Sequence, residues 1–139
     1  MSEGAFQNPS QAEIAALLGR SKRIAVVGLS SNVARPSNGV SQYLIDRGYE
    51  VIPVNPTEPE ILGRKSYGAL SDISGTIDIV DVFRRSDQTD PIIDEALKIG
   101  AKAIWLQEGV INDAGALKAQ RAGVFVVQDR CIKKELMRL

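Results

Sequence analysis

The sequence predicts an α/β fold of the Rossmann-like, three-layer class, with a five-stranded, mainly parallel sheet and helices on both faces. Two observations lead to this prediction. Short apolar runs, typical of buried strands, alternate five times with segments of helical periodicity. The connections between them are short, which favours parallel strands joined by helical crossovers. The length of 139 residues suits one domain, preceded by a flexible segment at residues 1–9.

The first elements are indicated by capping signals and glycine stops. Ser10 and Glu13 have the spacing of a capping box, and Gly19 ends the helix that they begin. The apolar run at residues 24–28 predicts a strand buried on both faces. A second helix follows the polar loop after this strand and ends at Gly48.

The middle of the chain is harder to assign. Residues 50–54 predict the second strand, although Pro53 cannot donate to a ladder and indicates a bulge or a strand end. Proline and glycine interrupt residues 57–72, for which we expect only a short helical turn at 67–70. The remaining elements are strands at 79–83, 103–106 and 124–127, helices at 92–99 and 132–139, and a helix capped at 112 or 113 that runs to 122.

The charge balance excludes several classes of partner. Lys and Arg together number 17, as do Asp and Glu, so the formal net charge is zero. Such a chain has no general attraction for nucleic acid or anionic lipid. No apolar run approaches the roughly 20 residues that span a bilayer, and the N-terminus does not resemble a signal peptide. With a single cysteine, Cys131, these features predict a cytoplasmic protein without a nucleic-acid or membrane partner.

The chain contains no histidine, which removes several chemistries at once. A Ser-His-Asp triad, a Cys-His pair, an imidazole zinc site and a phosphohistidine intermediate are all excluded within this chain. The groups that remain are backbone amides, hydroxyls, carboxamides, arginines and carboxylates. This set suits the binding of a phosphorylated ligand better than covalent catalysis.

Open parallel sheets bind ligands at the carboxyl ends of their strands, so the residues after each strand are the candidates. The loop after the first strand contains Gly28, which allows a tight turn, and the hydroxyl groups of Ser30 and Ser31. Residues 36–38 begin a helix whose N-terminal amides favour phosphate, and Arg35 can add a charged clamp. The alternative is an ordinary polar loop with a helix cap and a solvated arginine.

Neither common phosphate-binding fingerprint is present. Ser30 and Val33 occupy the positions of the second and third glycines of G-x-G-x-x-G, and the Gly-Lys-Ser/Thr of a P-loop is missing. At the end of the second strand, Asn55 stands where NAD-binding folds place an acidic residue. Ordinary NAD binding is therefore disfavoured, whereas Asn55 would not repel a ligand with an extra phosphate on its ribose.

The later strands supply further candidates. Of Arg84 and Arg85, one can meet phosphate while the other is solvated, or both form a charged rim. Glu108 is the carboxylate considered as a general base, although a surface or structural role for it is favoured. Cys131 is by default a buried, inert thiol, and the alternative is a thiolate activated by a nearby arginine and helix start. Asp81, inside the third strand, is interpreted as structural or solvent-facing.

Six short motifs occur in order at the strand ends: Ala25-Val-Val-Gly28-Leu-Ser30, Arg35-Pro36-Ser37, Val54-Asn55-Pro56, Asp81-Val-Phe83-Arg84, Trp105-Leu-Gln107-Glu-Gly109 and Asp129-Arg130-Cys131. Together they resemble the small CoA-binding proteins, single domains similar to the N-terminal CoA-binding domain of succinyl-CoA synthetase alpha subunits. The resemblance runs from about residue 23 to residue 135. It implies a Rossmann-like fold with CoA lying across the carboxyl edge of the sheet.

The resemblance also implies the residues of a cofactor site for CoA. Those expected to hold phosphates are Gly28, Leu29, Ser30, Ser31, Arg35, Ser37 and Asn38; those expected to line the adenosine part are Val54, Asn55 and Pro56; those expected to contact the rest of the ligand are Phe83, Arg84, Leu106, Gln107 and Glu108. The synthetase has a second domain with a phosphorylated histidine, and this sequence contains neither. Its ligase activity is therefore not implied.

We therefore expect a stand-alone module that binds CoA or a short acyl-CoA, holds no metal and is not itself an enzyme. The alternatives are an NADP-dependent oxidoreductase, an acyl-CoA-modifying enzyme, or an interaction subunit of a larger CoA enzyme with an unidentified protein partner. A homodimer is a further option, paired through an edge expected to be exposed at residues 105–109.

Overall fold

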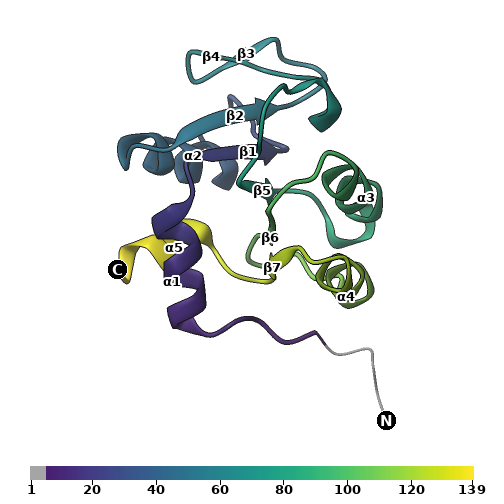
Figure 1. Cartoon of the computed structure of the whole chain (residues 1–139). Coiled ribbons are helices and arrows are strands. Elements are labelled where there is room, and N and C mark those ends of the chain that lie inside the picture. Colours follow the sequence, from purple (N-terminus) through teal and green to yellow (C-terminus); the bar gives the residue numbers. More distant parts are fainter. Residues whose placement is uncertain (1–5) are drawn as a thin grey trace.

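The computed structural model describes residues 6–139, so residues 1–5 of the predicted flexible segment lie outside the described residues. Figure 1 shows a sheet between two layers of helices, as the sequence predicts. The strands of this sheet are β1 (Arg23–Val27), β2 (Glu50–Val54), β5 (Ile79–Val82), β6 (Ala103–Leu106) and β7 (Phe125–Val127). The helices are α1 (Gln11–Arg20), α2 (Pro36–Asp46), α3 (Asp90–Lys98), α4 (Asp113–Arg121) and α5 (Ile132–Met137), with 3₁₀ turns η1 (Leu70–Asp72) and η2 (Ser86–Gln88). None of the helices in residues 6–139 has the length and apolar character needed to cross a membrane.

The topology of the sheet reverses at its centre. All five strands are parallel, and their order across the sheet is β2-β1-β5-β6-β7. From β1 the chain moves outward to β2 at the edge, and it then returns to place β5 on the other side of β1. The loops that follow β1 and β5 therefore diverge at the carboxyl edge, which is where open sheets of this kind bind ligands.

The side chains of the sheet alternate between two apolar layers. Helices α1, α2 and α5 cover one face, and α3 and α4 cover the other (Figure 1). In β5, for example, Ile79 packs in the first layer, whereas Val80 and Val82 pack in the second. Because both faces are buried, the strands appear in the sequence as continuous apolar runs rather than as alternating patterns.

The signals at the N-terminal ends of α1 and α4 are confirmed, whereas Gly19 lies inside α1, which continues to Arg20 with Ser21 as its C-cap. The Glu13 N–H donates to Ser10 Oγ at 3.1 Å, and the Ser10 N–H donates to Glu13 Oε1 at 2.9 Å, which completes the capping box of α1. At α4, the side chain of Asn112 accepts from the Gly115 N–H at 2.9 Å. These reciprocal bonds satisfy amides that the first turn of a helix leaves without partners.

The segment at residues 57–72 contains structure that the sequence analysis missed. A small antiparallel ribbon is formed by β3 (Glu60–Ile61) and β4 (Arg64–Lys65). The helical turn predicted at 67–70 lies instead at η1. Strands of two residues are too short to show a period, so their pairing leaves no pattern in the sequence.

Pro53 lies inside β2 without a bulge, opposite Val26 of β1. It is tolerated because β2 is an edge strand, so its missing N–H interrupts no ladder on the outer side. The Pro53 carbonyl accepts from the Tyr67 N–H at 3.0 Å, and the Asn55 N–H donates to the Tyr67 carbonyl at 2.9 Å. This short bridge covers the carboxyl end of the edge.

The prediction of an exposed edge at residues 105–109 is wrong. Trp105, Leu106 and Gln107 are buried, and only Glu108 and Gly109 are exposed. The reason is the position of β6, which lies inside the sheet between β5 and β7. The indole N–H of Trp105 is also satisfied internally, because it donates to the Arg130 carbonyl at 2.8 Å.

The described part of the N-terminal segment lies along the edge strand β7. The Asn8 side chain donates to the Gln128 carbonyl at 2.8 Å and accepts from the Gln128 N–H at 2.7 Å. Phe6 packs against the apolar layer beneath α3 and α4. Asn8 thus bonds to the chain just after β7 as a neighbouring strand would.

Asp81 lies at the centre of the sheet and is completely buried. Its register partners are Val26 of β1 and Trp105 of β6, on the face covered by α1, α2 and α5. Within the described residues, neither carboxylate oxygen has a hydrogen-bond partner, and the buried Ser41 hydroxyl on α2 has none either. Burial raises the pKa of Asp81 well above its ordinary value. The side chain is therefore structural and not solvent-facing.

This burial predicts a pH dependence of stability. Because the pKa of Asp81 is higher in the folded chain than in the unfolded chain, the folded state retains a proton that the unfolded state releases once the pH exceeds about 4. The free energy of unfolding should then fall by up to about 1.4 kcal/mol per pH unit across the window between the two pKa values. Asp81→Asn should remove this decrease. The free energy of unfolding of the variant, relative to that of wild type, should therefore increase with pH.

Urea unfolding between pH 4 and pH 8 measures this difference. Asp72→Asn is the matched control, because Asp72 is an exposed aspartate in η1. The control should follow the wild-type curve. Parallel curves for Asp81→Asn and wild type over this range would contradict the prediction.

Candidate functional site

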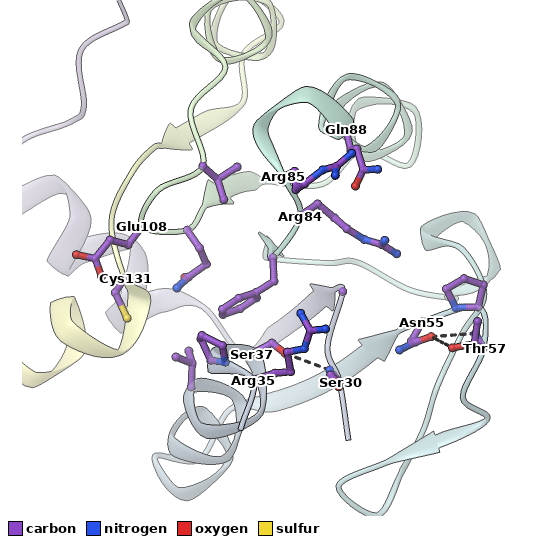
Figure 2. Close-up of a pocket in the computed structure, with 17 residues that line it drawn as sticks. Ser30, Arg35, Ser37, Asn55, Thr57, Arg84, Arg85, Gln88, Glu108 and Cys131 are labelled. Atoms are coloured by element: carbon purple, nitrogen blue, oxygen red, sulfur yellow. Dashed lines mark hydrogen bonds between the residues drawn. The ribbon is translucent and has the colours of Figure 1, made fainter. Parts of the chain in front are cut away.

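A cavity of about 740 Å³ opens at the carboxyl edge of the sheet, beside the reversal of strand order. Figure 2 shows that it is elongated, with Asn55 and Thr57 at one end and Glu108 and Cys131 at the other. Arg35 and Arg84 come from opposite sides and lie between these ends (Figure 2). The cavity is therefore long enough to accommodate an extended ligand and is cationic near its middle.

The floor of the cavity is one row of residues across three neighbouring strands. Val27, Val82 and Leu106 are register partners, so the next residues, Gly28, Phe83 and Gln107, form the row just beyond the strand ends. All three of these line the cavity. The side chain of Gln107 is buried, and its Oε1 accepts from the Ile132 N–H at 3.2 Å, which ties the floor to the start of α5.

Gly28 brings the backbones of two strands into close contact. Its φ of 88° lies in the left-handed region, and a Cβ atom there would overlap the carbonyl oxygen of Phe83. The Gly28 N–H donates to the Val54 carbonyl at 3.0 Å, and the Phe83 N–H donates to the Val27 carbonyl at 2.9 Å. The loop after β1 therefore leaves the sheet over β5 without a side chain in the way.

The loop after β1 uses its own polar groups to hold its shape. The Ser30 N–H donates to Ser37 Oγ at 3.1 Å, and Asn38 Nδ2 donates to the Ser30 carbonyl at 3.0 Å. The Asn32 N–H is bonded to Ser30 Oγ at 3.0 Å. These contacts fix the conformation of the loop. The charged donor that this loop directs to the cavity is Arg35, which is exposed and makes no capping bond at the start of α2.

The two arginines after β5 have different surroundings. Arg84 is half-buried and lines the cavity, and its Nε is a buried donor without a partner in the described residues. It also borders a second cavity of about 400 Å³ between the end of β2 and α3. Arg85 is exposed and pairs with Asp87 at 3.3 Å. Arg84 is thus the arginine whose hydrogen-bonding capacity is available inside the site.

The residues that follow β2 include Asn55, which was a predicted site residue, and Glu58, which was not. Asn55 is occupied by the protein itself, since its Nδ2 donates to the Leu29 carbonyl at 3.0 Å and its Oδ1 accepts from the Thr57 N–H at 2.8 Å. Three residues further on, Glu58 Oε2 accepts from the Ser31 N–H and from Asn55 Nδ2, both at 3.3 Å. A carboxylate therefore does lie beside the first loop, although not at the position where the strand pattern placed it.

At the opposite end of the cavity, Glu108 and Cys131 lie close together (Figure 2). Glu108 is exposed and forms an ion pair with Lys134 at 2.9 Å. The hydrogen bond from Lys134 to Glu108 raises the pKa of Lys134. Cys131 is half-buried at the N-cap of α5 and lines the cavity. The described residues contain no group of three His, Cys, Asp or Glu side chains that could hold a metal ion.

The structure brings most of the predicted site residues together. Those that line the cavity are Gly28, Ser30, Arg35, Ser37, Asn55, Pro56, Phe83, Arg84, Gln107 and Glu108. Leu29 and Leu106 are instead buried in the core, Ser31 and Asn38 shape the first loop, and Val54 borders the second cavity. Lining residues that the analysis did not assign to the CoA site are Pro36, Val40, Thr57, Arg85, Gln88, Val110 and Cys131.

The fold and the site together define the class of protein: a Rossmann-like domain with a cavity at the carboxyl edge that offers arginines to an extended ligand. The chain belongs to the CoA-binding domain family, whose family model matches residues 22–137. The match covers the whole five-stranded sheet and helices α2 to α5, and it begins after α1.

Individual proteins are similar to this chain in sequence or in fold. The uncharacterized protein YneT of Bacillus subtilis is 50% identical over 128 residues, which are 92% of this chain and 95% of that protein. A hypothetical protein from Pyrococcus horikoshii is 38% identical, with a TM-score of 0.91 and coverage of 100% of this chain and 99% of that chain. An acetyl-coenzyme A synthetase of Ca. Korarchaeum cryptofilum is 25% identical, with a TM-score of 0.71, and covers 78% of this chain and 26% of that chain.

The close contact between Gly28 and the Phe83 carbonyl predicts that one methyl group added at Gly28 strongly destabilises the fold. Gly28→Ala should destabilise the fold by about 1–3 kcal/mol, because the left-handed backbone and the overlap with the Phe83 carbonyl both oppose a side chain. Gly39→Ala is the matched control, since Gly39 lies in α2 with open space around its Cβ position. The control should stabilise the chain by about 0.5–1 kcal/mol. Thermal unfolding of both variants measures the difference, and equal effects would contradict the prediction.

Proposed function

We propose that this chain is a stand-alone, cytoplasmic module that binds CoA or a short acyl-CoA in the elongated cavity, without catalysing a reaction. The observation that carries the proposal is the pair of arginines, Arg35 and Arg84, that flank the middle of the cavity (Figure 2). Membership of the CoA-binding domain family supports the same ligand.

The ends of the cavity support one orientation of the ligand. The adenosine part fits the end formed by Asn55 and Thr57, where parallel sheets of this topology place a nucleoside. The pyrophosphate then lies between Arg35 and Arg84, whose guanidinium groups can bind phosphate oxygens in a bidentate manner. The pantetheine arm extends along Phe83 toward the thiol end at Cys131.

The polar groups at the thiol end support binding rather than catalysis. Glu108, the candidate general base, is exposed and engaged by Lys134 at 2.9 Å. Gln107 is engaged by the Ile132 N–H. The second candidate function, an NADP-dependent or acyl-CoA-modifying enzyme, would need Glu108 released from this pair. Turnover that is lost in Glu108→Gln would favour that alternative.

The first prediction from this proposal concerns Arg84. Isothermal calorimetry with CoA, acetyl-CoA, NAD and NADP should show binding of the two CoA compounds in preference to the two dinucleotides. Arg84→Gln should weaken CoA binding by about 10- to 100-fold, because a hydrogen bond from a charged group to phosphate contributes about 1.5–3 kcal/mol.

Arg47→Gln provides the matched control for this measurement. Arg47 lies at the C-terminal end of α2, where it donates to the Tyr43 hydroxyl at 2.9 Å, and it does not line the cavity. Its replacement should leave the affinity unchanged. The proposal is wrong if no CoA binding is detected at high micromolar ligand or if NADP binds more tightly than CoA.

The second prediction concerns the thiol end. If the pantetheine arm reaches Cys131, oxidised CoA should form a mixed disulfide with it: the Cys131 thiolate attacks one sulfur of the CoA disulfide, and the other CoA leaves as a thiol. Intact-mass measurement should show one added CoA that a reductant removes. Cys131→Ser should show no adduct, and an absence of adduct in wild type would contradict this orientation.

A further inference from the structure

We propose that Glu58 is a specificity residue that makes the ribose end of the site favour a ribose without a phosphate. This inference rests on the proposed function. Within the class of CoA compounds, it selects the form that lacks the 3′-phosphate of the ribose, 3′-dephospho-CoA.

The carboxylate occupies the corner between the loops after β1 and β2. Its Oε2 accepts from the Ser31 N–H at 3.3 Å and from Asn55 Nδ2 at 3.3 Å, so it is held by both loops. The Glu58 side chain is half-buried beside residues 55–57, which line one end of the cavity. In nucleotide-binding sheets of this topology, a residue at the end of the second strand meets the ribose, and Glu58 lies in the loop just beyond that end, bonded to Asn55.

Glu58 is the acceptor with spare capacity at this corner. The side-chain amide of Asn55 is used by Leu29 and by Glu58, and its carbonyl accepts both the N–H and the hydroxyl of Thr57, each at 2.8 Å. A carboxylate has about four lone-pair sites, and the two bonds above engage only one of its oxygens. The remaining oxygen can accept from the hydroxyl groups of a ribose.

The charge at the corner is not neutralised by a neighbouring cation. Within the described residues, no Lys or Arg forms a salt bridge with Glu58. Arg35 and Arg84, the lining arginines without a salt bridge in the described residues, lie toward the middle of the cavity (Figure 2). A carboxylate thus lies beside the nucleoside end of the cavity, and the arginines line the cavity where a pyrophosphate would lie.

This distribution of charge distinguishes two kinds of ribose. A ribose with free hydroxyl groups donates hydrogen bonds to the carboxylate, whereas a phosphate at the 2′ or 3′ position brings a second negative charge against it. The same repulsion acts against the 2′-phosphate of NADP. The sequence predicted that Asn55 would not repel a phosphorylated ribose. That prediction did not include Glu58, the second side chain at this corner.

The test is calorimetric titration of wild type and Glu58→Gln with CoA and with 3′-dephospho-CoA. Wild type should bind 3′-dephospho-CoA about tenfold more tightly than CoA, a ratio that corresponds to one screened charge repulsion. Glu58→Gln should bind CoA about tenfold more tightly than wild type does, with little change or a small loss for 3′-dephospho-CoA. Glu60→Gln removes a nearby exposed acid on β3 and should alter neither affinity.

A second measurement uses wild type alone and compares its affinities for the two compounds at several salt concentrations. The preference for 3′-dephospho-CoA should decrease as ionic strength rises, because salt screens the repulsion between the 3′-phosphate and Glu58. If wild type binds CoA as tightly as 3′-dephospho-CoA or more tightly, or if Glu58→Gln changes both affinities equally, this inference is overturned and the proposed function stands. If neither compound binds, both are overturned.

Discussion

The contact between the backbone at Gly28 and the carbonyl of Phe83 is the constraint on which the site depends. It lies where β1 and β5 are neighbours and the loops after them diverge, so the floor of the cavity exists only if the two chains can approach this closely. A residue with a side chain would separate them. Gln107 then completes the row from the third strand, and its bond to Ile132 positions α5 and with it Cys131.

The layer beneath this floor is unusual because it contains a buried acid. Asp81 precedes Phe83 by two residues on β5, so the two side chains lie on the same face of the sheet. Its neighbours Val26 and Trp105 stand in the same relation to Gly28 and Gln107. Burial without a hydrogen-bond partner raises the pKa of the Asp81 carboxyl, which costs stability at higher pH. The sheet thus tolerates a polar group in its core directly under the row that forms the site, where an apolar residue would pack more favourably.

The sequence was sufficient for most of the fold and for part of the site, and the difference has a physical origin. Strands buried on both faces and helices with capping boxes leave local patterns, so these elements could be predicted. The sequence did not show that Leu29 and Leu106 are buried while residues next to them line the cavity. Only the alternation of side chains in the folded sheet directs Gln107 to the cavity and Leu106 into the core. Glu58 was missed because a loop, rather than a strand, places its carboxylate beside Ser31.

The zero net charge of the chain conceals an ordered distribution of charge along the cavity. Lys134 neutralises Glu108 at the thiol end, and Asp87 neutralises Arg85 at the rim. Among the charged side chains that line the cavity, those without such a salt bridge in the described residues are Arg35 and Arg84 at its middle. Glu58, bonded to Asn55, lies beside the nucleoside end and also has no such salt bridge in the described residues. Since a charge already paired within the protein contributes little to recognising a ligand, the proposal assigns the choice of anion to these three side chains. Two cations and one anion in this order match a pyrophosphate attached to a ribose whose hydroxyl groups are free.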